Sequence, residues 1–220
     1  MLERVLEPEA MDTPQEADDY DAMDHSAVNQ QFVADLLAVG LPGPDILDLG
    51  TGTALIPVEL CRQYEECRIM AADVAPQMLD LARYNIEIAG LIERIQLDLC
   101  DAKNMLYADG MFHAVVSNSI VHHIAEPTGV LQESLRVTAT GGLLFFRDLF
   151  RPADDETLEQ LVQTYAGEEN EHQQKMFRDS LHAALTVDEF RDIIEPLGFQ
   201  RDTVQPTSDR HWTWVAHKPE

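Results

Sequence analysis

The sequence predicts an α/β fold: a doubly wound sheet of seven strands, mostly parallel, with helices on both faces. Short apolar runs, of the length of buried strands, alternate with stretches whose apolar residues recur at helical spacing. This alternation is typical of parallel sheets that are covered by helices. The runs that predict strands are residues 45–49, 68–73, 95–99, 112–117, 143–149, 199–204 and 211–217.

Turn residues and caps set the limits of the helices between these strands. Gly40 and Pro42 follow the first helix, and Pro76 opens the third, where its missing N–H costs least. Thr186 and Glu189 form a capping box, which is typical of a helix start. The predicted helices are residues 26–39, 54–64, 76–90, 128–138 and 186–198.

Two segments near the end of the chain depart from the simple alternation. Residues 151–185 contain two helical patterns separated by Gly167. We interpret them as an inserted helical pair above the sheet edge where ligands of open α/β sheets bind, and therefore as a candidate lid. The alternative is an ordinary pair of packing helices. Residues 199–204 and 211–217 predict an antiparallel hairpin, because the second run alternates with a period of two.

The length of 220 residues suits one α/β domain, which we place at residues 26–220. Residues 1–25 carry much acid and little periodicity, so they predict an acidic N-terminal arm that is partly loose. No run of 18 apolar residues predicts a membrane span, and the N-terminus lacks the apolar core of a secretory signal. The three cysteines are scattered, without metal spacing or a disulfide framework. We therefore expect a cytoplasmic protein.

The chain is strongly acidic, with 15 Lys and Arg against 40 Asp and Glu and a formal net charge of −25. Nucleic-acid partners require clustered positive charge, so the composition disfavours them, and it disfavours anionic membranes in the same way. The acidity is explained by solubility or adaptation to salt, or by a cationic substrate or partner; both explanations stay open.

The turn after the first predicted strand has the composition of a nucleotide-binding corner. Asp48 is followed by Gly50, Thr51 and Gly52, and a helix begins near residue 54. A dinucleotide fingerprint needs a third glycine for close helix–strand packing, but Leu55 occupies that place. The pattern therefore disfavours an NAD-dependent dehydrogenase, and a C-terminal hairpin would be an unusual end for such an enzyme.

Acidic residues follow three successive predicted strands. Asp73 lies about 20 residues beyond the glycine turn, where a carboxylate can bind both ribose hydroxyls. Asp48 suits an ammonium group, and Asp101 can accept a hydrogen bond from an exocyclic amine. The carboxyl ends of parallel strands share one sheet edge, so the three carboxylates predict one ligand with an amino group, a ribose and an adenine.

In this order and at these spacings, the motifs resemble the class I S-adenosylmethionine-dependent methyltransferases, within their small-molecule branch. The resemblance covers about residues 45–217 and rests on the run 48–54, Asp73, the pair 101–102 and residues 117–120. It implies a Rossmann-like fold, S-adenosylmethionine as methyl donor and S-adenosylhomocysteine as product. Two residues depart from the common pattern: Thr51 replaces a Cys or Ala and Ala54 replaces a Gly, both small.

The resemblance also implies which residues contact the methionine part of the cofactor. At the glycine turn these are Asp48, Gly50, Thr51 and Gly52. After the fourth strand, Asn118 and Ser119 are placed under the methionyl chain. Residues of the upstream segment close over the cofactor in related enzymes, and here Tyr20 and Asn29 are the candidates.

For the adenosine part, the resemblance places Asp73 on the ribose. Val74 and Met78 would sandwich the adenine, although Met78 on a helix face also suits the core. Asp101 and Ala102 would bind the adenine edge, with a helix cap as the alternative role of Asp101.

The segment after the fourth strand bears on the acceptor. It lacks the Asn/Asp-Pro-Pro-aromatic run of methyltransferases that act on adenine or glutamine amide nitrogens, so a small-molecule acceptor is favoured. His122 and His123 are the candidate catalytic residues, because a neutral imidazole can accept a proton from a hydroxyl. The alternative is contact with the cofactor backbone or a helix cap. We expect no metal site, because consecutive histidines point in different directions.

A second candidate for the acceptor site is the end of the fifth strand. There, Arg147 or Arg151 could pair with a substrate carboxylate, or Arg147 and Asp148 could pair and fix the lid hinge. The sequence thus predicts methyl transfer from S-adenosylmethionine to a small molecule by in-line displacement, mainly through positioning. The alternative is a non-catalytic module that binds S-adenosylmethionine or a protein partner.

Overall fold

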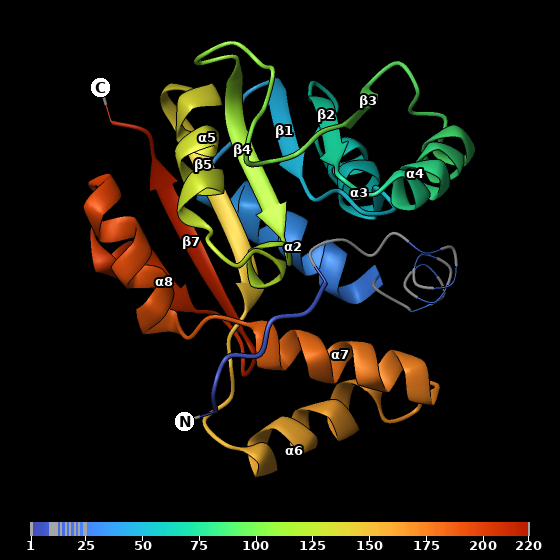
Figure 1. The fold of residues 1–220 in the computed structure, drawn as a ribbon. Helices are drawn as coiled ribbons and strands as arrows, with labels where there is room; N and C mark the ends of the chain where they lie inside the picture. Colours follow the sequence, from blue (N-terminus) through green and yellow to red (C-terminus); the bar gives the residue numbers. More distant parts are fainter. Residues whose placement is uncertain are drawn as a thin grey trace. The chain divides into compact units, whose positions relative to one another are not determined.

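The computed structural model describes residues 2–8, 13, 15, 17, 19, 21, 23 and 26–219. Figure 1 shows the fold. The strands are β1 (Asp45–Leu49), β2 (Arg68–Asp73), β3 (Ile95–Leu99), β4 (Phe112–Asn118), β5 (Thr138–Leu149), β6 (Val204–Pro206) and β7 (His211–His217). The α-helices are α2 (Ser26–Val39), α3 (Leu55–Gln63), α4 (Pro76–Ala89), α5 (Thr128–Val137), α6 (Asp155–Ala166), α7 (Glu171–Ala183) and α8 (Val187–Ile194). The short 3-10 helices are η1 (Val121–His123), η2 (Glu195–Leu197) and η3 (Arg201–Thr203).

The seven strands form one sheet in the order β3-β2-β1-β4-β5-β7-β6. β1 runs parallel to both β2 and β4, and β2 runs parallel to β3. β6 and β7 are antiparallel, with Val204 opposite Trp214. The predicted doubly wound sheet, mostly parallel with an antiparallel C-terminal hairpin, is therefore confirmed. Its order reverses between β1 and β4, the kind of switch point at which open α/β sheets bind ligands.

The fifth strand is longer than the sequence predicts. It begins at Thr138 rather than at residue 143, so it includes Gly141 and Gly142. A side chain at position 142 would come within 2.8 Å of the carbonyl oxygens of Ala139 and His113. The glycine here permits a close approach of backbone within the strand.

The sixth strand is shorter and later than predicted. Residues 201–203 form η3, and only Val204–Pro206 pair with β7. The Arg191 guanidinium donates to the carbonyl oxygens of Arg201 at 3.1 Å and Val204 at 2.8 Å, which holds this turn against α8. Such a long-range side-chain contact leaves no local signal in the sequence.

The described chain divides into two compact units. The first unit contains the described residues of 2–8, 119–128 and 146–215, and the second contains those of 13–118, 129–145 and 216–219.

The first unit is built around aromatic and aliphatic side chains. Trp212 and Phe190 stack with ring centroids 3.9 Å apart, and Trp214 packs edge-on against Phe199. The predicted helical pair forms as α6 and α7, whose buried side chains gather around Leu149. The capping box of Asn170 starts α7 after the break near Gly167.

Residues 2–8 belong to this unit and are fixed by hydrogen bonds, so this described part of the arm, which the sequence predicts to be partly loose, is held in place. The Arg4 guanidinium donates to the carbonyl oxygens of Ala183 at 2.7 Å and Ile124 at 3.0 Å. The backbone N–H of Val5 donates to the carbonyl oxygen of His182 at 3.1 Å. This short segment thereby contacts both η1 and the end of α7.

The second unit contains β1 to β4 and the helices α2 to α4, and in Figure 1 α3 and α4 lie next to each other beside these strands. Phe32 of α2 and Phe145 of β5 meet edge to face, with centroids 5.1 Å apart. Two of the cysteines that look scattered in the sequence are neighbours here, because the Sγ atoms of Cys61 and Cys67 are 3.5 Å apart. No described helix has the length and apolar content needed to cross a membrane.

Candidate functional site

The turn after β1 is held in an unusual backbone conformation. Gly50 and Gly52 have positive φ values of 69° and 54°. The N–H groups of Gly50 and Thr51 both donate to the carbonyl oxygen of Ala72, at 2.9 and 3.0 Å. The turn is thereby tied to the carboxyl end of β2. Ala54, the first residue before α3, has a φ of 61°, which an L-residue adopts only with strain.

Replacing Ala54 by Gly is expected to stabilise the protein by up to about 1 kcal/mol. The left-handed conformation costs an alanine about 1–2 kcal/mol, of which the greater freedom of an unfolded glycine takes back about 0.5–1. Ala75→Gly is the matched control, because Ala75 is also a buried residue before a helix but has a φ of −95°. Urea unfolding should show a gain for the first variant and a loss for the control. A loss of the same size in both would contradict the assignment of strain.

A pocket lies at this turn and opens to the solvent; the space inside it, together with the solvent at its mouth, amounts to about 330 Å³. The lining residues are Asn29, Asp48, Gly50, Thr51, Thr53, Leu55, Ile56 and Asn118. The structure therefore brings together five of the residues that the sequence selects, from α2, β1, the following turn and β4. The pocket also contains three residues that the sequence does not select, namely Thr53, Leu55 and Ile56.

Asp48 is the charged group of the pocket. Its side chain is 2% exposed. Burial raises its pKa from the ordinary 3.8 to about 7; Thr51 acts in the opposite direction, and the Asp73 carboxylate adds to the rise. Within the described residues, none of the groups that shift this pKa is a cation. A buried carboxylate of this kind is stabilised by an incoming ammonium group.

Two further polar atoms of the pocket lack a hydrogen-bond partner among the described residues. Within the described chain, the Oδ1 atom of Asn118 and the Oγ1 atom of Thr53 are buried and have no hydrogen-bond partner. Buried polar atoms are normally paired, because an unpaired one costs about 1–3 kcal/mol. Both residues line the pocket with Asp48. The pocket thus offers three oxygen atoms to a polar, cationic ligand.

Asp73 joins this turn to the end of β2. Its carboxylate accepts the N–H of Gly52 at 2.8 Å and the N–H of Ala75 at 2.9 Å. It is half-buried, and the adjacent Val74 is 45% exposed. An acceptor next to an exposed apolar side chain suits a nucleoside, with its polar ribose and flat base.

The other residues predicted for the adenine differ in their environments. Met78 is 4% exposed and packs with Ala17 and Ala75, which is the core position weighed as its alternative. Asp101 is exposed and accepts the N–H of Lys103 at 2.9 Å, so it stabilises its own turn. Ala102 is half-buried beside it.

Two other residues predicted to contact the cofactor are not among the described residues that line the pocket. Tyr20 lies outside the described residues. Ser119 belongs to the first unit, and its φ of 62° is a strained value for a residue other than glycine. Such strain is found at functional sites more often than elsewhere.

The two predicted catalytic histidines lie in the first unit, on η1, within a cluster of carboxylates. The Nδ1 atom of His122 is 2.5 Å from Oδ1 of Asp148, and its backbone N–H donates to the other oxygen of Asp148 at 3.0 Å. On the other side, its Nε2 atom is 3.4 Å from Oε1 of Glu7. The His122 side chain is only 3% exposed, which does not favour a role as general base toward a bound acceptor.

The pKa values of the two histidines are shifted in opposite directions. Burial lowers the pKa of His122, but Asp148 and Glu7 outweigh it and leave that pKa raised. Burial and the neighbouring His122 lower the pKa of His123 to about 3. Burial raises the pKa of Glu7. The two rings are close, with centroids 4.1 Å apart and planes 35° apart.

The expectation that consecutive histidines point in different directions is therefore wrong. In the 3-10 turn of η1 both rings face Glu7, and Arg4 holds this turn by donating to the carbonyl oxygens of His122 and Ile124. Sequence reasoning missed Glu7, because nothing distinguishes it among the acidic residues of the N-terminal segment. The sequence selects Asp148 only as a possible partner of Arg147 and does not indicate its contact with His122.

The two arginines at the end of β5 and just after it have structural partners. Arg147 donates from Nε to Oγ1 of Thr213 at 2.9 Å. Arg151 donates to the carbonyl oxygen of Ala184 and to Oε1 of Glu189, at 2.8 and 2.6 Å. Arg151 thus holds the start of α8 and its capping box.

The chain is similar to known methyltransferases. A family described as "Methyltransferase domain" matches residues 47–146. A malonyl-[acyl-carrier protein] O-methyltransferase of Geobacter sulfurreducens is 31% identical over 186 residues, which cover 84% of this chain and 67% of the relative. A release factor glutamine methyltransferase of Chlorobaculum tepidum is 40% identical over 96 residues, 42% of this chain and 32% of the relative. The chain thus spans about two thirds of the first relative and about one third of the second.

One solved structure illustrates the likeness in fold. It is the crystal structure of a SAM dependent methyltransferase from Aquifex aeolicus, with a TM-score of 0.71 and 18% sequence identity. The match covers 94% of this chain and 98% of that chain.

Proposed function

Because the chain belongs to the S-adenosylmethionine-dependent methyltransferases, we propose that it transfers a methyl group from S-adenosylmethionine to a small-molecule acceptor. The observation that carries this proposal is the pocket of Asp48. A buried carboxylate without a cation, beside the unpartnered oxygens of Asn118 and Thr53, fits the amino-acid end of the cofactor.

The remaining residues extend the same site toward a nucleoside. Asp73 offers a carboxylate to the ribose hydroxyls, and the exposed Val74 offers an apolar surface to the base. Asn29 lines the pocket with Asp48, as the sequence predicts. Met78 is buried with Ala17 and Ala75, so we assign it to the core rather than to the base.

When bound, S-adenosylmethionine supplies an electrophilic methyl group on a sulfonium. The chain then has to position the acceptor in line with that methyl group and to exclude water, and both contribute to the rate without a general base. This fits a site in which the buried His122 is engaged by Asp148. We further propose that the helical pair α6 and α7 acts as a lid over the acceptor.

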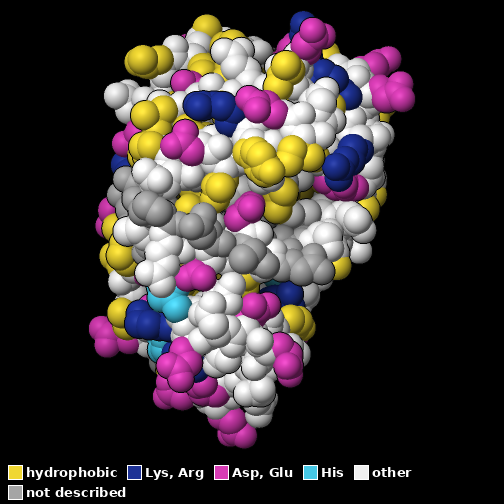
Figure 2. Space-filling model, turned by 90° about the vertical axis from the view of Figure 1, so that its right-hand side faces the viewer, with side chains coloured by type: hydrophobic (Ala, Val, Ile, Leu, Met, Phe, Trp, Pro, Cys, Tyr) yellow, Lys and Arg dark blue, Asp and Glu magenta, His cyan; other side chains and the backbone are white. Residues whose placement is uncertain are grey.

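A small-molecule acceptor is favoured over a peptide glutamine or a nucleic-acid base. Asn118-Ser119-Ile120 stands where methyltransferases of amide and base nitrogens carry an Asn/Asp-Pro-Pro run. The acidic surface disfavours a nucleic-acid acceptor in particular: Figure 2 shows Asp and Glu side chains spread over the face drawn there. Free cysteines fit a cytoplasmic location, which remains part of the proposal.

Calorimetry with S-adenosylmethionine and S-adenosylhomocysteine tests the proposal directly. We expect both to bind with micromolar affinity. In a panel of small hydroxy, carboxy, amino and thiol compounds, we expect an acceptor to be methylated, which converts S-adenosylmethionine into S-adenosylhomocysteine. If neither S-adenosylmethionine nor S-adenosylhomocysteine binds, the proposed cofactor site is refuted. Binding without turnover on any acceptor would instead support a non-catalytic module on the same fold.

Asp73→Ala is expected to weaken binding of S-adenosylhomocysteine by about 1.5–3 kcal/mol, or about 10- to 150-fold, because charged hydrogen bonds to the ribose are lost. The control is Asp80→Ala, since Asp80 is exposed on α4. Calorimetric titration of the two variants checks the difference. Equal affinities would exclude Asp73 from the cofactor site.

A further inference from the structure

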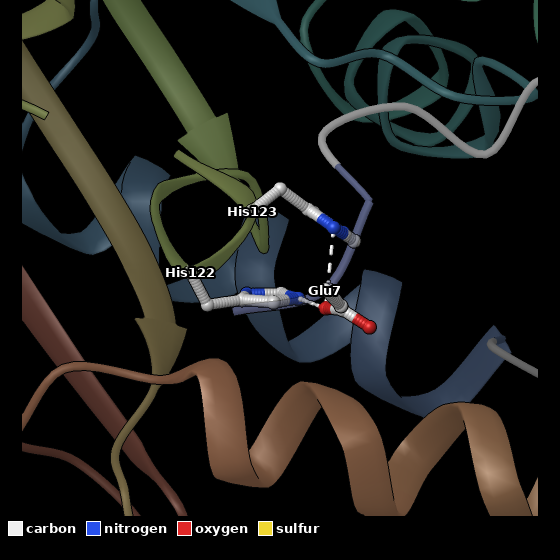
Figure 3. Close-up of side chains that lie close together, drawn as sticks. All are labelled: Glu7, His122 and His123. Carbon is white, nitrogen blue, oxygen red and sulfur yellow. Dashed lines mark ion pairs between the residues drawn. The ribbon is translucent and has the colours of Figure 1, made fainter. Parts of the chain in front are cut away.

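The cluster on η1 offers three metal-binding atoms from three side chains. They are Nε2 of His122, Nδ1 of His123 and Oε1 of Glu7, and all lie within 4.8 Å of one another. Figure 3 shows the two rings and the carboxylate turned toward one another. All three residues belong to the first unit, so the cluster does not depend on the cofactor pocket.

The separations within the cluster match those between ligands of one metal ion. Oε1 of Glu7 is 3.4 Å from Nε2 of His122 and 3.2 Å from Nδ1 of His123. Metal–ligand bonds of about 2.0–2.1 Å in tetrahedral geometry place neighbouring ligand atoms about 3.3 Å apart. Two edges of the required polyhedron are therefore already formed by the protein.

Two of the three atoms form no hydrogen bond in the described part of the chain. Within the described residues, Oε1 of Glu7 and Nδ1 of His123 are buried and form no hydrogen bond, although they are only 3.2 Å apart. Their side chains are 13% and 10% exposed. The two atoms lie at ion-pair distance from each other without a hydrogen bond, and a cation bound to both would give each of them a partner.

The surroundings of His122 are those of a metal ligand. Its Nδ1 atom faces Asp148 at 2.5 Å, which fixes the ring and directs the other nitrogen, Nε2, toward Glu7. Metal-binding histidines usually donate their second N–H to a carboxylate in this way. Arg4 fixes the turn by donating to the carbonyl oxygen of His122, and Asp148 also accepts the His122 N–H.

We propose that Glu7, His122 and His123 bind one divalent transition-metal ion, with Zn²⁺ as the best match. Two imidazoles and one carboxylate suit zinc and its neighbours, whereas Mg²⁺ and Ca²⁺ prefer oxygen ligands alone. Three protein ligands leave a fourth position for water or another small ligand. The ion would also join residues 2–8 to η1, two segments that are more than a hundred residues apart in the sequence.

The test uses the full chain without an affinity tag, stripped of metal with a chelator and then dialysed. Zn²⁺ is titrated by calorimetry, and Co²⁺ by visible absorption, which reports ligand geometry. We expect one equivalent of Zn²⁺ to bind with a Kd below about 1 μM, and millimolar Mg²⁺ not to compete. Zn²⁺ should also raise the thermal unfolding midpoint.

Two variants change proposed ligands, and a third changes the carboxylate that orients His122. Glu7→Gln and His123→Gln are expected to weaken Zn²⁺ binding by at least about 100-fold, and Asp148→Asn by about 10- to 100-fold through the orientation of His122. Glu3→Gln is the matched control, an exposed acid of the same segment, and should bind like the wild type. Circular dichroism checks that each variant is folded.

Failure of the wild-type chain to bind Zn²⁺ or Co²⁺ would overturn the proposal without reference to any variant. Equal affinities of the wild type and Glu7→Gln would overturn it as well. Neither measurement includes cofactor or acceptor, so the result is independent of the proposed methyl transfer.

Discussion

Asp48→Asn is expected to separate stability from cofactor binding: the variant gains stability above pH 7 but binds S-adenosylhomocysteine at least about 10-fold more weakly. Folding raises the pKa of Asp48 from 3.8 to about 7, so it disfavours the ionised carboxylate. That rise sets an upper limit of about 4 kcal/mol, and with relaxation of the site we expect a gain of about 1–3 kcal/mol from the neutral amide. The weaker binding follows from loss of the charge that pairs with the ligand ammonium.

The pH dependence has a definite sign. Between about pH 4 and pH 7 the folded protein keeps a proton on Asp48 that the unfolded chain has lost, so stability falls as the pH rises through this range. The advantage of Asp48→Asn should therefore grow from pH 4 to pH 7 and then level off. Urea unfolding at several pH values measures it.

Binding of the cofactor is expected to change the protonation of Asp48 as well. An ammonium beside Asp48 favours its ionised form, so binding at pH 6 should release a proton. Calorimetry in buffers of different ionisation enthalpy counts that proton, which should be missing in Asp48→Asn. Asp45→Asn is the control, because Asp45 lies at the other end of β1 and pairs with Arg68 on the surface. Full affinity of the Asp48 variant would exclude the ammonium pairing.

Trp212→Ala is expected to lower the free energy of unfolding by about 3–5 kcal/mol, the usual cost of truncating a large aromatic side chain in a core. The Trp212 side chain is fully buried and stacks on Phe190 of α8. Its removal would leave a cavity between α8 and β7. Chemical denaturation followed by far-ultraviolet circular dichroism measures the loss.

Two further variants show what the ring contributes. Trp212→Phe keeps an aromatic ring and removes an indole N–H that has no partner within the described residues, so we expect it to cost about 1–2 kcal/mol. Tyr84→Ala, at a side chain that is 62% exposed, should change stability by less than about 1 kcal/mol. Similar losses in Trp212→Ala and Tyr84→Ala would contradict the assigned core.

The sequence predicted the fold well where the signals were local. Strand-length apolar runs and helix caps near Pro76 and Thr186 placed most elements, because such signals act over a few residues. The prediction was wrong where distant contacts decide the backbone. Gly142 lies inside β5 because the carbonyl oxygen of His113 approaches it, and η3 replaces a strand because Arg191 binds its carbonyl oxygens.

For the candidate cofactor site, too, local motifs were predictive and features set by distant contacts were not. Asp48, Asn118 and Asn29 were predicted from motif and order, and they line one pocket. Burial could not be predicted for Met78, since a methionine on a helix face suits a core and a ligand platform equally. The cluster of Glu7 with His122 and His123 joins distant segments, and no spacing rule in one sequence connects them.

The connectivity of the first unit has a consequence for how the chain is made and handled. Arg4 and Ala183, which are hydrogen-bonded, are 179 residues apart in the sequence. Closing so long a loop is entropically costly and slow, and on the ribosome it must wait until α7 has been synthesised. The second unit is interrupted in its turn by residues of the first. Neither unit is therefore one continuous fragment, and a truncation after β4 would keep the residues that line the cofactor pocket but remove the part of β5 that belongs to the same unit.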